Sequence, residues 1–506
     1  MTRLQLSRDE VTVRSDLGGN PRSLIDDGSS VLLRLLHVSD MHLIDAGSPA
    51  RSDWVEAKAD DPKWHPLLHM CRPFDTLVNW GLASFVRGAK NNGGELADLA
   101  IFTGDNIDNA QQNELDAYLA LLDGGTFSFP YEGPQEAHWA SDPRTASLRD
   151  SRGRWPFWVP DGGVNDLWQD QHGYPNLPGL LHETGRQITS PGLGLPWLPV
   201  MGNHDVMRQG TAYSTPHLDQ IATGAWRAAT GPANFAPPSP FDAYMANVAA
   251  FSDGEVRFPV SRNPGRRSIT RTEFIGAHIE QARRLGHARG FTSTGSGDYV
   301  HDCDYVRIVV LDTNHPDGHY QGSIGDHQLV WLHEVLTASD RDQVPVLVAT
   351  HHGGISLDNT YVDPSPLNEH SAEDRKLAAE MEAVLHRHRS VVAWLVGHRH
   401  IHRIRPISDP LGVGSGFWEI TTGSLIDSPT EARLVEVIAG ADQSIGIRTS
   451  IVSHDDCDTE HPEQSIRLGA LHRHLAEIEA RTGPETRGRR NGRPGDRAAV
   501  LARPVV

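Results

Sequence analysis

Five short apolar segments of this 506-residue chain each run into a polar motif. Such runs, bounded by turn residues, are typical of buried β-strands. In open α/β sheets, ligands bind at the carboxyl ends of the strands. The five pairs, strand first, are 31–38 with Asp40-Met41-His42, 99–103 with Gly104-Asp105-Asn106-Ile107-Asp108, 196–201 with Gly202-Asn203-His204-Asp205, 344–350 with His351-His352, and 391–396 with Gly397-His398-Arg399-His400. The pattern predicts an α/β fold with one site at the strand ends.

The segments between these strands complete the expected fold. Apolar spacing predicts helices at 73–90, 109–122, around 329–336 and near 372–388, with a further strand at 305–311. After residue 402, three segments alternate apolar and polar residues or are rich in β-formers: 415–422, 432–438 and 443–453. They predict consecutive antiparallel strands that close a second sheet.

The chain divides into a main domain with additions. We expect an N-terminal extension over 1–30, a main domain over 31–455, a C-terminal helix over 456–480 and a basic tail over 481–506. Two stretches, 124–195 and 206–300, interrupt the main domain, and the first carries four tryptophans. Structureless loops of that length are unusual, so we expect ordered insertions that cap the site. The tail has seven arginines and two acids among glycine and proline, a composition that predicts disorder.

Charge and cysteine content narrow the class of protein. Lysine and arginine number 46 against 65 acids, a net charge of −19, which is a poor match for duplex DNA or an anionic membrane. The three cysteines are widely spaced and predict no disulfide framework. No signal peptide and no run of about 18 apolar residues is visible, so a cytoplasmic protein is expected. The sequence specifies no oligomeric state.

The motifs supply a particular set of donors. Asp40 and His42 can share a cation if their loop is extended, because residues two apart then point the same way. Asp105 offers a carboxylate, Asn203 an amide oxygen and His351 an imidazole; His398 and His400 project together from a strand end. Carboxylates, imidazoles and an amide without thiolate suit two divalent cations such as Fe, Mn or Zn.

The chain contains its own comparison for the last motif. The His-Arg-His triplet at 398–400 recurs at 386–388 and at 472–474. Both repeats lie in helical patterns, where residues two apart occupy nearly opposite faces. We therefore expect those four histidines to be solvated surface residues. His352 should face away from His351 and contact substrate or the surroundings of the metals.

The ordered set DxH, GDxxD, GNH[DE], H and GHxH resembles the calcineurin-like metallophosphoesterase superfamily, over about residues 31–425. That resemblance implies a four-layer α/β fold in which two mixed sheets pack together between helices. It implies that Asp40, His42 and His400 hold one metal, that Asn203, His351 and His398 hold the other, and that Asp105 bridges them. It also implies that His204 is the catalytic histidine, oriented by Asp108.

The resemblance implies a dinuclear phosphoesterase that cleaves a small or medium soluble phosphate ester by attack of a metal-bridging hydroxide. Asn109 stands where the protein Ser/Thr phosphatases of the superfamily carry arginine, and Asp108 where purple acid phosphatases carry a tyrosine ligand. Bacterial small-molecule enzymes fit best. The alternatives are a nucleotide or nucleic-acid phosphodiesterase, with nucleic acid disfavoured by charge, and a regulatory protein that binds phosphate and keeps its metals without turnover.

One arginine-rich stretch bears on the substrate. Residues 255–290 hold eight arginines against three glutamates. An arginine from this insertion could clamp a second phosphate, and Arg266 and Arg267 are the candidates. A solvated surface patch is the alternative for most of the cluster.

Overall fold

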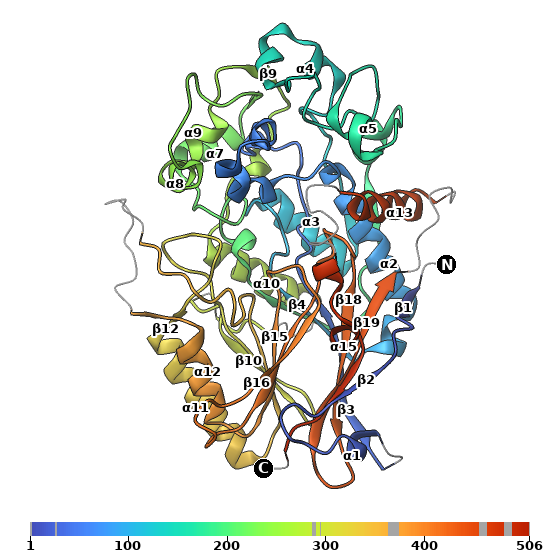
Figure 1. The fold of residues 1–506 in the computed structure, drawn as a ribbon, viewed down its shortest axis with the longest axis vertical. Coiled ribbons are helices and arrows are strands. Elements are labelled where there is room, and N and C mark those ends of the chain that lie inside the picture. Colours follow the sequence, from blue (N-terminus) through green and yellow to red (C-terminus); the bar gives the residue numbers. More distant parts are fainter. Residues whose placement is uncertain are drawn as a thin grey trace.

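The computed structural model describes residues 3–25, 28–285, 290–293, 295–362, 374–454, 463–479 and 488–504. Two mixed sheets dominate it (Figure 1). The eight-stranded sheet runs β2-β20-β19-β18-β3-β4-β7, and β1 also pairs with β19. Its strands are β1 (Leu4–Leu6), β2 (Thr12–Arg14), β3 (Ser30–Val38), β4 (Leu99–Thr103), β7 (Trp197–Val200), β18 (Ala432–Ala439), β19 (Ile445–His454) and β20 (Ala499–Leu501).

The six-stranded sheet runs β10-β11-β13-β15-β17-β16. Its strands are β10 (Tyr299–Asp302), β11 (Arg307–Val310), β13 (Val346–Ala349), β15 (Val391–Val396), β16 (Arg403–Ile407) and β17 (Phe417–Thr421). Strands β3, β4 and β7 are parallel in the first sheet, as are β11, β13, β15 and β17 in the second. Every residue of β4 and β15 is buried, which explains their continuous apolar sequences, because both faces of each sheet are covered.

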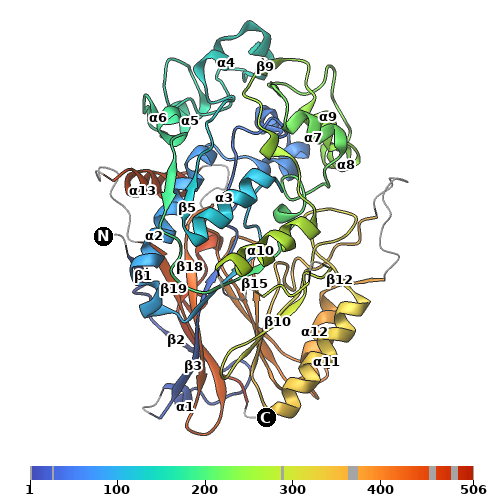
Figure 2. The ribbon, with the colours of Figure 1, turned by 180° about the vertical axis from the view of Figure 1, so that it is seen from behind.

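Helices cover the outer faces of the two sheets. Helices α2 (Val78–Leu96), α3 (Gln112–Asp123) and α13 (Gln464–Glu477) lie on the side of the eight-stranded sheet, and α11 (Asp326–Asp342) and α12 (Ala378–His386) on the other (Figures 1 and 2). Leu332 and Leu336 of α11 pack with Val348 of β13 and Trp394 of β15 in one buried cluster. The four-layer α/β architecture expected from the sequence is thereby confirmed.

Within the described residues the two insertions are folded, and most of their elements form a lobe at one end of the sandwich (Figure 2). The first contains β5 (Gly125–Phe127), α4 (Ala137–Ser141), η4 (Pro143–Leu148), α5 (Leu167–His172), α6 (Leu180–Thr184) and β6 (Ile188–Ser190). The second contains α7 (Pro216–Ala222), β8 (Trp226–Ala228), α8 (Pro240–Ala246), α9 (Val248–Ser252), β9 (Arg257–Pro259), η6 (Pro264–Arg266) and α10 (Arg271–Leu285). The four tryptophans of the first insertion, Trp139, Trp155, Trp158 and Trp168, are buried, whereas Trp226 of the second is 56% exposed.

Short elements complete the chain. They are α1 (Arg22–Ile25), the 3-10 helices η1 (Asp53–Lys58), η2 (Pro62–Met70), η3 (Asp75–Leu77) and η5 (Asn203–Asp205), the strands β12 (Ile324–Gly325) and β14 (Arg375–Lys376), and α15 (Pro494–Arg497). Trp54 of η1 and Trp64 of η2 pack with Leu218, Tyr244 and Phe251 of the second insertion. The second insertion therefore packs against the segment 53–70.

Both ends of the chain differ from the sequence-based expectation. In the expected disordered tail, β20 pairs antiparallel with β19 and parallel with β2, and its three residues are buried. Residues 481–487 of that tail lie outside the described residues. Strands β1 and β2 likewise make 1–30 part of the sheet and not a separate extension. Composition misled here because the three apolar residues of β20 are outnumbered by neighbouring arginine, glycine and proline.

The three late strands are divided between the sheets. β18 and β19 are antiparallel, as expected, but they belong to the eight-stranded sheet. β17 lies parallel to β15 in the other sheet, and β16, which the sequence analysis missed, pairs antiparallel with β17. Among the described residues, no helix is both long and apolar enough to cross a lipid bilayer.

Candidate functional site

The five sequence motifs meet where the strands of both sheets end. Asp40 follows β3, Asp105 follows β4 and Asn203 follows β7 in the eight-stranded sheet. His351 follows β13, and His398 and His400 follow β15, in the six-stranded sheet. Because these are parallel strands, their carboxyl ends lie at the same edge, and the packing of the two sheets brings both sets of loops together.

The first group consists of Asp40, His42 and His400. His400 Nε2 lies 3.2 Å from Asp40 Oδ1 and 3.4 Å from His42 Nε2. One donor atom from each of the three residues lies within 4.8 Å of the others, a spacing that could hold one metal ion. These are the residues that the resemblance assigns to the first metal.

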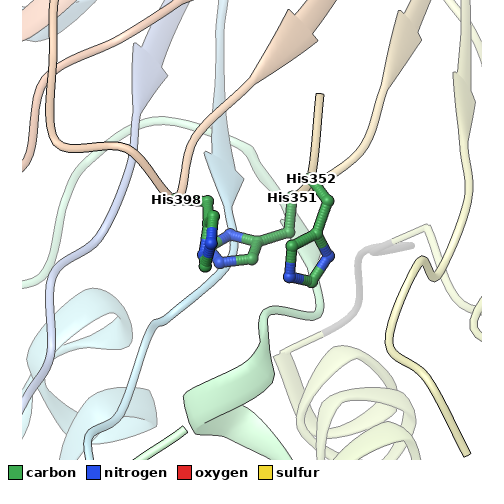
Figure 3. A group of neighbouring side chains, drawn as sticks. All are labelled: His351, His352 and His398. Atoms are coloured by element: carbon green, nitrogen blue, oxygen red, sulfur yellow. The ribbon is translucent and has the colours of Figure 1, made fainter. Parts of the chain in front are cut away.

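The second group consists of Asn203, His351 and His398. His351 Nε2 lies 2.9 Å from Asn203 Oδ1, and the His351 and His398 ring centroids are 5.1 Å apart. Figure 3 shows the His351 and His398 rings side by side, each on a loop that follows a different strand. Nε2 of His398 is 3.1 Å from Gln321 Oε1, which leaves Nδ1 as the nitrogen open to a metal.

Asp105 lies between the two groups. Its Oδ2 is 3.2 Å from His351 Nε2 and 3.7 Å from His42 Nε2, while its Oδ1 accepts a hydrogen bond from the backbone N–H of His204. A carboxylate with one histidine of each group within reach is placed to contact two cations at once.

The imidazoles are held in one orientation by partners behind them. Nδ1 of His42 is 3.1 Å from Asp108 Oδ1, Nδ1 of His351 is 2.7 Å from the Thr103 carbonyl, and Nδ1 of His400 is 2.6 Å from Asp427 Oδ2. A partner on Nδ1 fixes the tautomer that presents the lone pair of Nε2. All three rings therefore direct Nε2 toward the common centre, as metal ligands require.

The loops that carry the donors have unusual backbone conformations. Asp40, His42, Asp105, His398 and His400 have φ of 51°, 48°, 50°, 68° and 51°. The left-handed region is sparsely populated by residues other than glycine and costs about 1–3 kcal/mol for each residue held there. The expectation of an extended loop at Asp40 and His42 is therefore wrong. Both side chains still converge, because they leave a left-handed turn and not a pleated strand.

The glycines of two motifs are required by close packing. Gly104 has a φ of 91°, and a Cβ there would lie 2.4 Å from His351 Nδ1. A Cβ on Gly202 would lie 2.3 Å from Asp105 Oδ1. Any larger residue at either position would push a donor out of the centre.

His204 lies next to the two metal groups, and Asp108 holds its ring in place. Its Nδ1 is 2.8 Å from the Asp108 carbonyl and 3.3 Å from Asp108 Oδ1, so Nε2 is the nitrogen free to act. Burial lowers the pKa of His204, but Asp105 and Asp108 outweigh it and hold that pKa above its ordinary value. The buried Arg51 guanidinium, whose Nη1 is 2.5 Å from Asp108 Oδ2, keeps this carboxylate ionised.

A cavity of about 610 Å³ opens onto the site. His42, Asp105, Asn203, His204, His398 and His400 form its floor. Its walls come mainly from residues 59–72 and from Tyr320, Arg399, Asp427, Glu479 and Arg490. The wall that we expected from the two long insertions is thus provided by the shorter segment after the first motif.

The expected substrate contacts lie elsewhere. Arg266 is buried, with its Nε 2.7 Å from Asp45 Oδ2, and Arg267 binds Glu273 and Gln112. His352 is fully buried, and its two nitrogens are 2.9 Å from Thr313 Oγ1 and 3.0 Å from the Tyr320 carbonyl. None of the three lines the cavity. These assignments are corrected: each side chain already has partners within the protein.

The repeated His-Arg-His triplets are not at the centre, although three of their four histidines are not solvated either. His386 and His388 are buried, with His388 Nδ1 2.7 Å from Asp340 Oδ2. In α13, His472 is buried against Phe74 and His474 is exposed, as opposite helix faces require. The expectation of surface positions failed because the end of α12 and one face of α13 pack against neighbouring elements.

This triplet provides a matched test. Replacing His398 with Gln is expected to weaken metal binding by more than the roughly 10- to 100-fold typical of residues that only support a ligand. His474→Gln, in the same triplet sequence, should leave metal content unchanged because the side chain is exposed in α13. Elemental analysis and metal titration measure both. Metal loss in the His474 variant would contradict the assignment.

Three further residues of the site were not predicted from the sequence. Asp427 lies six residues after β17 and belongs to no motif, yet it orients His400. Arg51 follows the first motif in a loop and neutralises Asp108. Arg399 stands inside the last motif at a position that the motif leaves open. The strand-end rule could have indicated Asp427, whereas the arginines become visible only through their neighbours.

Comparisons with known proteins find partial similarity to several phosphatases. No family model matches it. Over 117 residues it is 30% identical to the manganese-dependent ADP-ribose/CDP-alcohol diphosphatase of Xenopus tropicalis, a match that spans 22% of this chain and 29% of that protein. Similar solved structures are a dimetal phosphatase from Danio rerio (12% identity, 84% of this chain, 97% of that one, TM-score 0.35), a purple acid phosphatase from yellow lupin (11%, 83%, 51%, 0.30) and a 5′-nucleotidase precursor from Thermus thermophilus (10%, 83%, 54%, 0.27).

Proposed function

We propose that the chain is a calcineurin-like metallophosphoesterase that uses two divalent cations to hydrolyse a small or medium phosphate ester. One observation carries this proposal: the Asp105 carboxylate lies between a group built on Asp40, His42 and His400 and a group built on His351. All donors are oxygen or imidazole nitrogen, which suits Mn, Fe or Zn.

Each residue has a role in this proposal. Asp40, His42 and His400 would hold one cation, Asn203, His351 and His398 would hold the other, and the Asp105 carboxylate lies within reach of both positions. The two cations would supply a nucleophile from water at neutral pH and neutralise the phosphoryl oxygens. His204 gives the proton on Nε2 to the leaving oxygen, and Asp108 holds the ring by its Nδ1. We place the enzyme in the reducing cytoplasm, because the three cysteines are widely spaced in the sequence and predict no disulfide framework.

A pair of chromogenic substrates tests the reaction class. We expect metal-loaded protein to release nitrophenol from p-nitrophenyl phosphate, and chelation followed by added Mn²⁺ to abolish and restore the rate. Faster cleavage of bis-p-nitrophenyl phosphate would instead identify a phosphodiesterase. If neither ester is cleaved at any metal loading, the protein is the regulatory phosphate-binding alternative. The supported His204 argues against that outcome, since binding alone needs no proton donor.

A second candidate is hydrolysis of a phosphoanhydride in a nucleotide-sized molecule. The cavity of about 610 Å³ exceeds what a simple phosphate monoester fills, and it is in the range that holds ligands of drug size. The matched relative is named as a diphosphatase that depends on manganese, so Mn²⁺ is the first metal to load.

A further inference from the structure

Three arginines line the wall of the cavity above the metal groups: Arg72, Arg399 and Arg490. The chain has a net charge of −19, so three arginines close together at the site proposed to bind phosphate should each have an anionic partner. For two of them the partner is present. Arg72 Nε is 2.7 Å from Asp427 Oδ1, and Arg490 Nη2 is 3.3 Å from Asp427 Oδ2.

Those two arginines act on the metal site through Asp427. This carboxylate also accepts a hydrogen bond from Nδ1 of His400 at 2.6 Å. Its neighbours Arg490, Arg72 and His400 hold the pKa of Asp427 well below its ordinary value, against the effect of burial. Arg72 and Arg490 are thus committed to the residue that orients a metal ligand, and they are positioning residues.

Arg399 is different. It lies between His398 and His400, it is exposed at the cavity wall, and within the described ranges its guanidinium has no ion pair and no hydrogen bond. The two flanking histidines are both left-handed, so the backbone on either side of Arg399 is fixed by the site itself. An unpaired guanidinium on a loop of set conformation, beside two metal groups, is suited to bind an anion of the substrate.

We propose that Arg399 binds a second phosphoryl group of the substrate, adjacent to the one held at the metal groups. The inference rests on the proposed function and favours its second candidate, in which the substrate is an organic diphosphate. The metal groups account for the first phosphoryl, and Pro66, Leu68 and the ring of Tyr320 offer an apolar wall for the organic part. A monoester would leave Arg399 without a partner.

The test measures binding separately from turnover. Calorimetry on Mn²⁺-loaded protein compares a nucleoside α,β-methylene diphosphate, which resists hydrolysis between its phosphorus atoms, with the corresponding nucleoside phosphonate. The parent protein should bind the diphosphate analogue roughly tenfold or more tightly, the scale of one charge-assisted contact. Arg399→Gln should remove most of that preference, and Arg399→Lys should retain part of it because the charge remains.

Arg403→Gln is the matched control, since Arg403 is exposed on β16 nearby and does not line this cavity. Its preference should equal that of the parent. An Arg399→Gln protein of normal metal content with an unchanged preference would overturn the inference. The proposal that the protein hydrolyses simple phosphate esters would be unaffected by that result. If the protein hydrolyses no ester but its preference for the diphosphate analogue still depends on Arg399, the proposed function is wrong. The contact of Arg399 with the second phosphoryl group is then still supported.

Discussion

Asp105→Asn is expected to lose both metals and nearly all turnover together. The substitution removes the charge from the one carboxylate that lies near histidines of both metal groups, His42 and His351. The cations of such a site stabilise the charge of the transition state by several kcal/mol, and loss of that stabilisation corresponds to a rate loss on the order of 10³-fold. Elemental analysis and the nitrophenyl phosphate rate measure the two losses on the same sample.

The control for this variant is Asp116→Asn, an equivalent change on an exposed face of α3. It should keep metal content and rate at the values of the parent. Two metals per chain and a near-normal rate in the Asp105 variant would show that this carboxylate does not bridge. Loss of folding, seen as a changed circular dichroism spectrum, would point instead to its hydrogen bond with the His204 backbone.

His204→Ala is expected to separate chemistry from metal binding. The ring is proposed as a proton donor and not as a ligand, so both metals should stay while kcat falls roughly 10²–10⁴-fold. Asp105 and Asp108 raise the pKa of His204 despite its burial, which favours the protonated ring that a donor needs. The rate of the parent should therefore fall as pH rises through this raised pKa, and that limb should be missing in the variant.

The choice of leaving group makes this test specific. A nitrophenolate leaves without a proton, whereas an alkoxide needs one. The variant should therefore lose far more activity on an alkyl phosphate than on p-nitrophenyl phosphate. Equal losses on both substrates would rule out proton donation and assign His204 to positioning of the phosphoryl group.

Much of the fold could be predicted because its strands are buried on both faces. The strands 99–103 and 391–396 were predicted to the residue, since each is a run of apolar residues, ending in Thr103 in the first, with a glycine directly after it. β16 was missed because Arg403, Arg405 and Pro406 interrupt its apolar pattern at the edge of the sheet. β20 is only three residues long, and its place between β2 and β19 is decided by partners far away in the sequence.

The residues of the site likewise divide into those that could be predicted from the sequence and those that could not. The donors were predictable because each one ends a strand, and strand ends meet at one edge of a parallel sheet. Their companions were not, since the contact of Asp427 with His400 and that of Arg51 with Asp108 depend on how loops from different motifs pack. Arg266 was misassigned for that reason: nothing in its local sequence reveals the buried Asp45 that holds it.

The left-handed residues of the three ligand-bearing loops have a consequence for how metals would enter. Side chains on such residues are aimed by the backbone, which the sheets hold rigid, and the ring orientations of His42 and His400 are fixed by Asp108 and Asp427. Little conformational entropy is left to lose when a cation binds, so the centre is preorganised, and binding free energy is not spent on ordering the ligands. The strain lies in the scaffold, where it is offset during folding, and each metal meets a site whose shape is already set.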